Sequence, residues 1–291
     1  MAEKEERAPL TVLRSAAELR AATAPYRADG VLIGLVPTMG ALHAGHLTLV
    51  QRARLDCGLV IASLFVNPTQ FGEGEDFDAY PRDEAEDMAL FAKHGVDIVY
   101  APGVGEMCPD GFGVTVTVDG VTDGLCGDFR PGHFDGVTTV VSRLFDHCQP
   151  YVAYFGEKDY QQLKVIEKMT AQLGLDIRIV GVPIVRSRTG LALSSRNAYL
   201  ADPQIRVASA LYGTLTAIAG RMEPGIDLAA QCAWGRQALL DAGFDTVDYF
   251  EIRDAATLAP AEMFGPGLRI FAAAWIGETR LIDNLSADAP V

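Results

Sequence analysis

Two histidines follow a short apolar run, and they are the residues of this sequence most suited to chemistry. The run is Val31 to Val36, and the segment after it reads Pro37-Thr38-Met39-Gly40-Ala41-Leu42-His43-Ala44-Gly45-His46. Three residues apart on one helical face, His43 and His46 are able to donate hydrogen bonds to the same phosphate group. A pair of capping or surface histidines is the simpler alternative. A zinc pair would need a further ligand, to which the sequence does not point.

The position of this segment favours a phosphate. A short apolar run predicts a strand buried on both faces of a parallel sheet. Open α/β sheets bind ligands at the carboxyl ends of their strands, where helix N-termini accept phosphate. Gly40 permits a tight turn at this point, and Gly45 lets a flat ring or a phosphate approach the backbone closely.

A second polar segment, Phe65 to Gly72, follows the next expected strand. Its neutral side chains Asn67 and Gln70 are suited to reading hydroxyl and carboxylate groups without adding charge. Turn chemistry alone also explains Asn67-Pro68, so the segment carries little weight by itself.

Two further segments supply cations and hydroxyl groups. Lys158, within Gly156 to Gln162, is a mobile cation at the expected start of a helix and suits a polyphosphate. An N-cap role for Asp159 with Lys158 merely solvated is the alternative. Two serines and an arginine lie together in Ser194-Ser195-Arg196-Asn197, a pattern typical of a phosphate clamp. An ordinary helix-capping loop would explain them as well.

Other stretches are less specific. The acidic segment Glu75 to Asp87 has carboxylates that could hold magnesium, although an acidic helix face is more typical. Arg130 and His133 are candidate phosphate contacts whose roles stay open. Cys126 with His133 imitates a thiol nucleophile, but no helix N-terminus or motif surrounds that cysteine. The sequence contains no G-x-x-x-x-G-K-[ST] loop, no G-x-G-x-x-G after a strand, and no G-x-S-x-G elbow.

Composition excludes several classes of protein. The chain has 291 residues, 24 Lys+Arg against 38 Asp+Glu and a formal charge of -14, which disfavours nucleic acid as a partner. No apolar run reaches the roughly 18 residues that cross a bilayer. The five cysteines are scattered without a CxxC pair, and the N-terminus lacks a secretory signal, so we expect reduced thiols and a cytoplasmic location.

Alternating strands and helices predict a doubly wound parallel sheet followed by a smaller α+β C-terminal domain. The boundary is expected after residue 187, which gives domains 1–187 and 188–291. We expect strands at residues 11–13, 31–36, 59–66, 96–101, 114–118, 151–155 and 177–184, and later at 247–253, 268–275 and 279–282. Helices are expected from Ser15, which is followed by Glu18 in a capping-box pattern, over 42–56, from Pro81 to Gly95, and over 137–147, 159–173, 203–219 and 227–242.

The ordered set PTMGALHAGH, FVNPTQFG, YPR, RPGHFDGV, FGEKDYQQ and GLALSSRN closely resembles the pantoate:beta-alanine ligase family, and RLIDN at Arg280 to Asn284 is also similar. The resemblance covers nearly the whole chain. It implies a Rossmann-like nucleotidyltransferase fold and ATP-dependent condensation of pantoate with beta-alanine through a pantoyl adenylate, with release of AMP and pyrophosphate. It further implies Mg2+, a homodimer, and a C-terminal domain that forms a lid over the active site.

The resemblance also implies roles for single residues. His46 takes the position of the proton donor, joined in catalysis by His43, Lys158 and Arg196. Asp87 takes the position of a magnesium ligand, and Gln70, Gln162 and Asn67 those of pantoate-binding residues. The implied ATP site consists of Met39, Gly40, Ala41, Leu42, His43, Ala44, Gly45 and His46, with Gly156, Glu157, Lys158, Asp159, Val185, Leu193, Ser194, Ser195 and Arg196.

This sequence departs from the family pattern at a few positions. Leu193 replaces a methionine, Thr69 replaces an apolar residue, and Thr189 replaces an acid. Because no phosphate-binding side chain is altered, we expect these changes to affect the fine tuning of loop closure and not the activity. Two other functions stay open: a nucleotidyltransferase that acts on a phosphorylated alcohol, and a nucleotide-binding regulatory protein without catalysis.

Overall fold

The computed structural model describes residues 9–109 and 113–288, which divide into two compact units. The first unit contains the chain up to Thr117, Gly132–Phe155 and Met169–Val182; the second contains Val118–Pro131, Gly156–Lys168 and the chain from Pro183. The domain boundary after residue 187 and the lid role of the C-terminal part stay predictions. Among the described residues, no helix has the length and apolar character needed to cross a membrane.

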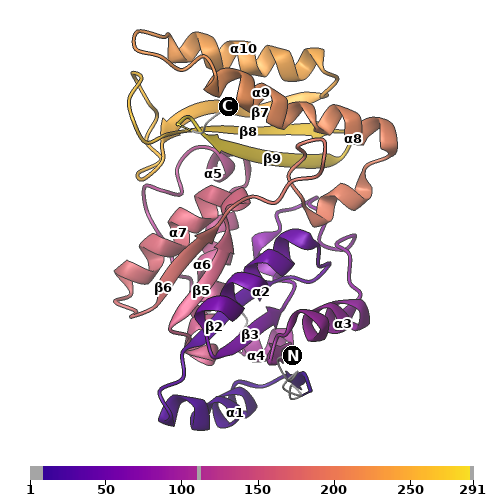
Figure 1. Ribbon diagram of the computed structural model, residues 1–291, viewed down its shortest axis with the longest axis vertical. Coiled ribbons are helices and arrows are strands. Elements are labelled where there is room, and N and C mark those ends of the chain that lie inside the picture. Colours follow the sequence, from indigo (N-terminus) through magenta and orange to yellow (C-terminus); the bar gives the residue numbers. More distant parts are fainter. Residues whose placement is uncertain (1–8, 110–112, 289–291) are drawn as a thin grey trace, which may run out of the picture. The chain divides into compact units, whose positions relative to one another are not determined.

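A six-stranded sheet forms the centre of the first unit (Figure 1). Its order is β1 (Thr11–Leu13), β4 (Ile98–Tyr100), β3 (Leu59–Leu64), β2 (Ile33–Thr38), β5 (Val152–Gly156) and β6 (Arg178–Val182). β2 pairs in parallel with β3 from Ile33↔Leu59 to Thr38↔Leu64, and with β5 on its other side. Sheet growth therefore reverses between β2 and β5, the point where sheets of this type bind ligands.

Helices cover this sheet in two groups. α2 (Ala44–Asp56) packs on β2, β3 and α3 (Glu84–His94), whereas α6 (His133–Cys148) packs on β2 and α1 (Ala16–Ala28). A four-residue helix, α4 (Val104–Met107), follows β4. β2 and β3 are buried along nearly their whole length, as strands covered on both faces must be. The predicted doubly wound fold is confirmed.

Local sequence signals predicted some helix ends correctly and others wrongly. Ser15 and Glu18 form the predicted capping box of α1, and Gly95 ends α3 in the left-handed conformation with φ +81°. The predicted start of α3 at Pro81 is wrong. The helix begins at Glu84, because the Asp83 carboxylate accepts the backbone N–H of Glu86 and acts as the N-cap.

The predicted strand at 114–118 is also wrong. None of its residues belongs to a strand or to an isolated bridge in the part of the chain that the structure describes. The backbone N–H of Val116 donates to Oγ1 of Thr139 at 3.0 Å, and its carbonyl accepts from Oγ1 of Thr138. Side chains of α6 thus satisfy the groups that a neighbouring strand would otherwise use.

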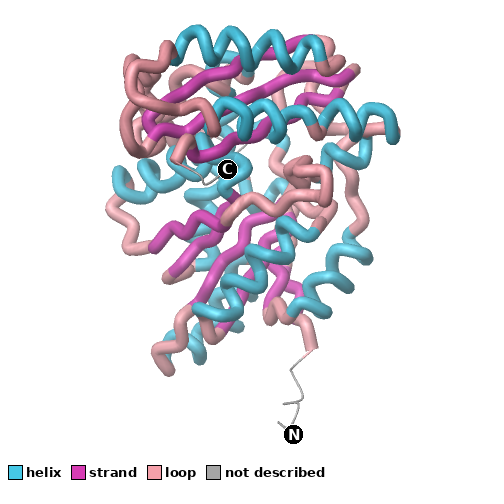
Figure 2. The backbone as a smooth tube through the Cα atoms, turned by 45° about the horizontal axis from the view of Figure 1, so that its top comes forward, coloured by secondary structure: helices cyan, strands magenta, loops and turns pink. Residues whose placement is uncertain are grey.

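A three-stranded antiparallel sheet of β7 (Thr246–Asp254), β8 (Leu268–Ile276) and β9 (Thr279–Ser286) forms the core of the second unit. α10 (Leu228–Asp241) packs on β7, while α9 (Ala210–Ala219) packs on α10, β8 and β9 (Figure 2). The apolar core between them includes Leu215, Leu239 and Ile270. The predicted α+β character of this region is confirmed.

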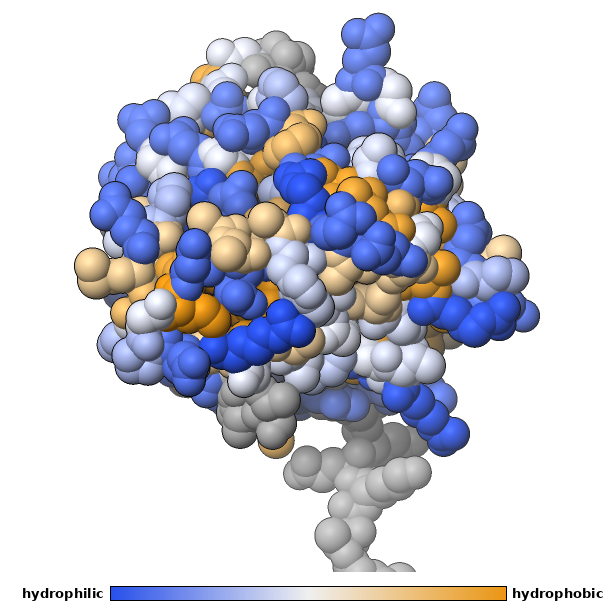
Figure 3. Space-filling model, turned by 90° about the horizontal axis from the view of Figure 1, so that it is seen from above, coloured by the Kyte–Doolittle hydropathy of each residue, from blue (hydrophilic) through white to orange (hydrophobic). Residues whose placement is uncertain are grey.

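The helix predicted over 203–219 is two helices, α8 (Asp202–Ala208) and α9, which meet at Ser209. The Ser209 hydroxyl donates to the carbonyl of Ile205, and its Oγ lies 2.8 Å from Oγ1 of Thr189. The short helices η1 (Pro68–Gln70), α4, α5 (Cys126–Phe129), η2 (Glu157–Asp159) and η3 (Ser195–Tyr199) were not predicted. On the face drawn in Figure 3, hydrophilic side chains separate the apolar groups into small patches.

Candidate active site

The loop after β2 is held in an unusual conformation by one carboxylate. Gly40 and Ala41 have φ values of +84° and +51°, a region that residues other than glycine rarely adopt. The Asp87 carboxylate, from α3, accepts the backbone N–H groups of Ala41 at 3.0 Å and Leu42 at 2.9 Å. Burial raises the pKa of Asp87, although these two hydrogen bonds oppose the rise.

The two histidines form a reciprocal cap at the start of α2. Nδ1 of His43 accepts the backbone N–H of Gly45 at 3.1 Å, and Nδ1 of His46 accepts the backbone N–H of His43 at 3.3 Å. Their ring centroids are 4.1 Å apart. Because each Nδ1 is an acceptor, the ring proton of each histidine is on Nε2. Both rings are therefore set up as Nε2–H donors, and the capping alternative and the donor role are compatible.

Gly45 is required by one of these rings. A Cβ at this position would lie 2.7 Å from Cε1 of His43 and 2.9 Å from its Nδ1. The flat ring that approaches the backbone at Gly45 is thus the protein's own imidazole, and the approach of a ligand to Gly45 stays a prediction.

Asn67, the N-cap of η1 (Pro68–Gln70), and Gln70, its last residue, belong to one hydrogen-bonded group. Asn67 is 2% exposed, and its Nδ2 donates to the carbonyl of Gly136 and to Oε1 of Gln70, both at 3.1 Å. Nε2 of Gln70 lies 2.9 Å from Sδ of Met39. The carbonyl of Gln70 accepts a hydrogen bond from Nδ1 of His133 at 2.8 Å. His133 and Asn67 thus hold Gln70 from two sides.

In the second unit, the backbone around Lys158 is fixed from β9. Lys158 lies in η2 (Glu157–Asp159), and Nδ2 of Asn284 donates to the carbonyls of both Glu157 and Lys158 at 2.9 Å. The Lys158 ammonium lies 3.6 Å from the Asp159 carboxylate, and its side chain is 19% exposed. α7 (Tyr160–Gln172) continues directly from η2, and the N-cap role of Asp159 stays a prediction.

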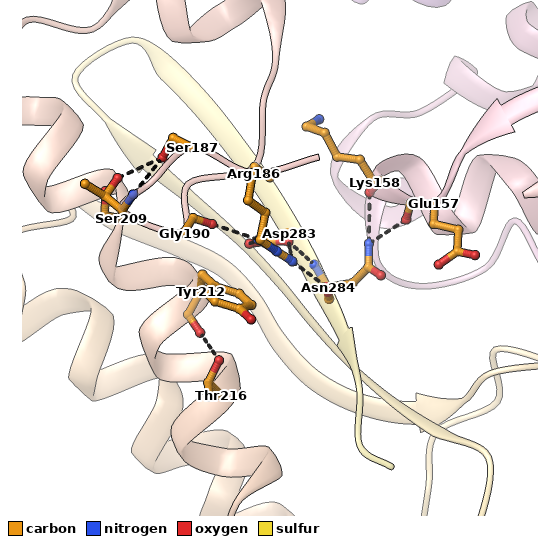
Figure 4. A network of polar contacts seen from close by, with 12 residues as sticks. Glu157, Lys158, Arg186, Ser187, Gly190, Ser209, Tyr212, Thr216, Asp283 and Asn284 are labelled. Carbon is orange, nitrogen blue, oxygen red and sulfur yellow. Dashed lines mark hydrogen bonds and ion pairs between the residues drawn. The ribbon is translucent and has the colours of Figure 1, made fainter. Parts of the chain in front are cut away.

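Residues 185–193 form a small hairpin that precedes the serine pair. Leu193 donates its N–H to the carbonyl of Val185, and Ser187 donates to that of Leu191. Oγ of Ser194 accepts the backbone N–H of Arg196 and caps η3. Figure 4 shows the guanidinium of Arg186 at the base of this hairpin, facing Asp283.

The glutamines at the start of α7 differ in role. Gln161 is 5% exposed; it donates to the carbonyls of Val121 and Gly124 and accepts the N–H of Cys126. Gln162 is half-buried, and its side chain forms no hydrogen bond within the part of the chain that the structure describes. Sequence reasoning named Gln162 and missed Gln161, whose partners lie more than 30 residues away.

A thiol nucleophile finds no support at Cys126. This cysteine is 7% exposed, its Sγ lies 3.3 Å from Oη of Tyr249 in the second unit, and His133 is committed to Gln70 in the first unit. Within residues 9–109 and 113–288, no three His, Cys, Asp or Glu side chains gather as a metal site.

The predicted site residues divide between the units. The first unit holds Met39 to His46, Asn67, Gln70 and Asp87; the second holds Gly156 to Asp159, Gln162, Val185 and Leu193 to Arg196. Their roles stay predictions at this point. Sequence reasoning missed Arg186, Asp283 and Asn284, although RLIDN contains two of them.

Comparison with known proteins assigns the chain to a family. The family profile described as Pantoate-beta-alanine ligase matches residues 11–286. The chain belongs to the pantoate-beta-alanine ligase family. The pantothenate synthetase of Paramagnetospirillum magneticum is 53% identical over 277 residues, covering 95% of this chain and 98% of the relative. That of Rhodospirillum rubrum is 53% identical over 281 residues, with the same coverage.

Solved structures of this ligase family share the fold. Pantothenate synthetase from Thermus thermophilus has a TM-score of 0.87 and 47% identity, covering 95% of this chain and 99% of that one. The pantoate-beta-alanine ligase from Francisella tularensis, described as complexed with beta-gamma ATP and beta-alanine, has a TM-score of 0.82 and 31% identity, covering 97% and 99%. The family expected from the sequence motifs is confirmed.

Proposed function

We propose that this chain condenses pantoate with beta-alanine at the expense of ATP, releasing AMP and pyrophosphate. The observation that carries the proposal is the family match over residues 11–286. The Francisella relative, which is described as complexed with beta-gamma ATP and beta-alanine, supports the same substrates here.

The first step makes the carboxyl group of pantoate reactive. A carboxylate oxygen attacks the α-phosphorus of ATP, the bond from that phosphorus to the bridging oxygen breaks, and pyrophosphate leaves with the electron pair. Negative charge grows on the leaving group, so fixed donors and cations accelerate the step. We assign this role to Lys158, Arg196, Ser194 and Ser195, with the backbone N–H groups around Gly156 as further donors.

His43 and His46 act as neutral donors in this scheme. Their Nδ1 atoms accept backbone N–H groups, so each ring carries its proton on Nε2, and we assign these Nε2–H groups to the phosphate oxygens. Met39 to Leu42 form the ATP-binding loop, and Asp87 maintains its shape.

Pantoate is assigned to the amide side chains. Gln70 is oriented by Asn67 and by the Sδ of Met39, and Gln162 has a half-buried amide without a hydrogen-bond partner among the described residues. Primary amides both donate and accept, which suits a ligand with hydroxyl and carboxylate groups. We retain Asn67 in this group mainly as the residue that holds Gln70.

The second step forms the amide. The uncharged amine of beta-alanine attacks the carbonyl carbon of the pantoyl adenylate, the bond to the phosphate oxygen breaks, and AMP leaves. Both steps are displacements between bound substrates, so no protein nucleophile is needed and positioning supplies the advantage. Val185 and Leu193 are assigned to the ATP site, with closure of the C-terminal part as a lid.

Magnesium is proposed as a companion of ATP. Mg2+ is commonly held by one or two carboxylates together with substrate phosphates and water. Asp87, the proposed ligand, is 3% exposed and its oxygens already accept two backbone N–H groups. Because this arrangement does not fit an open metal ligand, we derive no step through the ion. A homodimer is likewise proposed from the family resemblance, and a cytoplasmic location from the five scattered cysteines.

Pyrophosphate exchange tests the function. The purified chain is incubated with ATP and labelled pyrophosphate, with and without pantoate, and without beta-alanine. We expect label to enter ATP only when pantoate is present, and AMP to accumulate once beta-alanine is added. ATP binding without exchange would indicate a regulatory protein instead. Exchange that requires a phosphorylated alcohol would indicate a different nucleotidyltransferase.

A further inference from the structure

We propose that Asp283 and Asn284, adjacent on β9, are positioning residues for the phosphate-binding groups of the second unit. Asn284 fixes the backbone that carries Lys158, and Asp283 fixes the hairpin that leads to Ser194 and Arg196. The inference rests on the proposed function, since it assigns these residues to the adenylation step.

Asn284 commits its whole carboxamide to this task. The residue is 2% exposed, and its Nδ2 donates to two consecutive carbonyls, those of Glu157 and Lys158, each at 2.9 Å. Its Oδ1 accepts from a guanidinium nitrogen of Arg269. Movement of η2 would leave buried polar groups unsatisfied, which is costly, so the Lys158 backbone is fixed relative to β9.

Asp283 performs the matching role for the hairpin. Its side chain is 2% exposed, and its two oxygens accept from Arg186 at 2.6 and 2.9 Å. The same guanidinium donates to the carbonyl of Gly190 at 3.0 Å and stacks 3.9 Å from the ring centroid of Tyr212. A Cβ at Gly190 would lie 2.4 Å from that ring, so the hairpin tip fits closely against it (Figure 4).

The two anchors are coupled through one strand. Neighbouring residues of a strand direct their side chains to opposite faces, which lets Asp283 reach the hairpin while Asn284 reaches η2. The Asp283 carboxylate also accepts the N–H of Asn284 at 2.8 Å, and the carbonyl of Asn284 accepts from Arg186 at 3.3 Å. Both η2 and η3 pack on β9. Lys158 and the serine pair are thus both held in position by the same strand, β9.

Stability alone is a weak reason for this arrangement. Burial raises the pKa of Asp283, and the Arg186 guanidinium offsets only part of that cost. Buried ion pairs often add little net stability over apolar residues of the same size. Holding the phosphate-binding groups in a fixed position explains the Asp283–Arg186 pair better than a gain in stability does.

The same sheet provides a matched control. Asp248 pairs with Arg280 at 2.7 Å, with side chains 12% and 13% exposed, and also accepts from Nε1 of Trp275. This ion pair lies in the same three-stranded sheet but contacts neither η2 nor the hairpin. Asp283→Asn and Asp248→Asn therefore make the same chemical change in two buried ion pairs of one sheet.

The test measures two quantities for each variant: the kcat of pantoate-dependent pyrophosphate exchange and the melting temperature. We expect Asn284→Asp, whose carboxylate would face two carbonyl oxygens, to lower kcat about 100-fold, a loss typical of a misplaced catalytic group. Asp283→Asn should lower kcat by about tenfold or more. Asp248→Asn should lower the melting temperature to a similar extent as Asp283→Asn but keep kcat within about twofold. If Asn284→Asp does not fold, Asn284→Ser, which is smaller and keeps one donor, takes its place.

A double-mutant cycle separates positioning from general damage. If Asn284 acts through Lys158, Asn284→Asp should have little further effect on kcat in a Lys158→Ala background, because coupled residues are not additive. If the effects of the two mutations on kcat are fully additive, or if folded Asn284→Asp and Asp283→Asn keep the wild-type kcat, the inference is wrong but the proposed function still stands. Absence of exchange in the unaltered chain would overturn the proposed function as well.

Discussion

Gly40 and Asp87 depend on each other in the loop after β2. A Cβ on residue 40 would lie 2.7 Å from Oδ2 of Asp87 and 2.8 Å from Cδ1 of Leu64. The carboxylate reaches the backbone N–H groups of Ala41 and Leu42 only because residue 40 has no side chain. One glycine and one acid thus fix the conformation of the proposed ATP-binding loop.

Gly40→Ala should destabilise the chain by about 2 to 5 kcal/mol, the sum of a left-handed backbone cost and an overpacking cost. Gly30→Ala is the matched control, because Gly30 has φ +70° and no atom within 4 Å of the added Cβ. It should cost only about 1 to 2 kcal/mol. Urea unfolding measures both, and equal losses would show that the contact with Asp87 is unimportant.

Asp87→Asn tests whether Asp87 supports the loop or binds the metal. An amide presents only one oxygen, so one of the two backbone hydrogen bonds is lost, and we expect the KM for ATP to rise about tenfold. The Mg2+ concentration that gives half-maximal rate should stay the same, because the carboxylate is already occupied by backbone N–H groups. A selective shift in the Mg2+ requirement would instead make Asp87 a metal ligand.

Two replacements of His46 separate its capping role from its donor role. Asn has its oxygen near the position of Nδ1, so His46→Asn should keep the cap and the melting temperature while lowering kcat by about 10² to 10³. His46→Gln has a donor near the position of Nε2 and loses the cap, so it should retain more activity with lower stability. Equal kcat values in the two variants would remove the Nε2–H group from the mechanism.

Gln70→Ala should abolish most pantoate use while leaving ATP binding largely intact. The residue contacts Asn67 and Met39 through its amide. Truncation removes these contacts but leaves the hydrogen bonds by which Asp87 holds the backbone of the ATP-binding loop. Pyrophosphate exchange at increasing pantoate concentrations measures pantoate use, and calorimetric titration with ATP measures ATP binding. A parallel loss of both would indicate a damaged fold.

His147 should make stability depend on pH near neutrality. Its Nδ1 lies 2.8 Å from Oη of Tyr100, and burial lowers the pKa of His147 below 6.5. As the pH falls below about 6.5, the unfolded chain binds a proton that the folded chain does not, so the free energy of unfolding decreases with falling pH. The slope reaches at most about 1.4 kcal/mol per pH unit.

Urea unfolding between pH 5 and 8 measures this slope in the unaltered chain and in His147→Gln. The variant cannot titrate, so its slope should be smaller across the same range. Identical slopes would assign the pH dependence to other groups.

The sequence predicted the elements whose signals are local. Val31 to Val36 and Leu59 to Val66 became β2 and β3 because buried parallel strands need continuous apolar residues. The 114–118 segment, Val-Thr-Val-Thr-Val, is rich in the β-branched residues that favour strands. Its backbone instead finds hydrogen-bond partners in Thr138 and Thr139, which no local pattern shows.

The candidate site followed the same division. Residue types and their spacing in the sequence identified the motif residues, but they did not identify the residues that hold the motifs in position. Asn284 contacts Lys158 across 126 residues of chain, and Arg186 contacts Asp283 across 97. Such pairs depend on tertiary packing, which periodicity and capping signals do not encode.

The chain passes between the two units five times, after residues 117, 131, 155, 168 and 182. A ribosome that has just synthesised Lys158 has not yet made the strand that holds it. We therefore expect the phosphate-binding groups of the second unit to become ordered late in synthesis, after Asn284 has emerged. A fragment cut after residue 187 would retain Lys158 and Arg186 but lack both of their anchors.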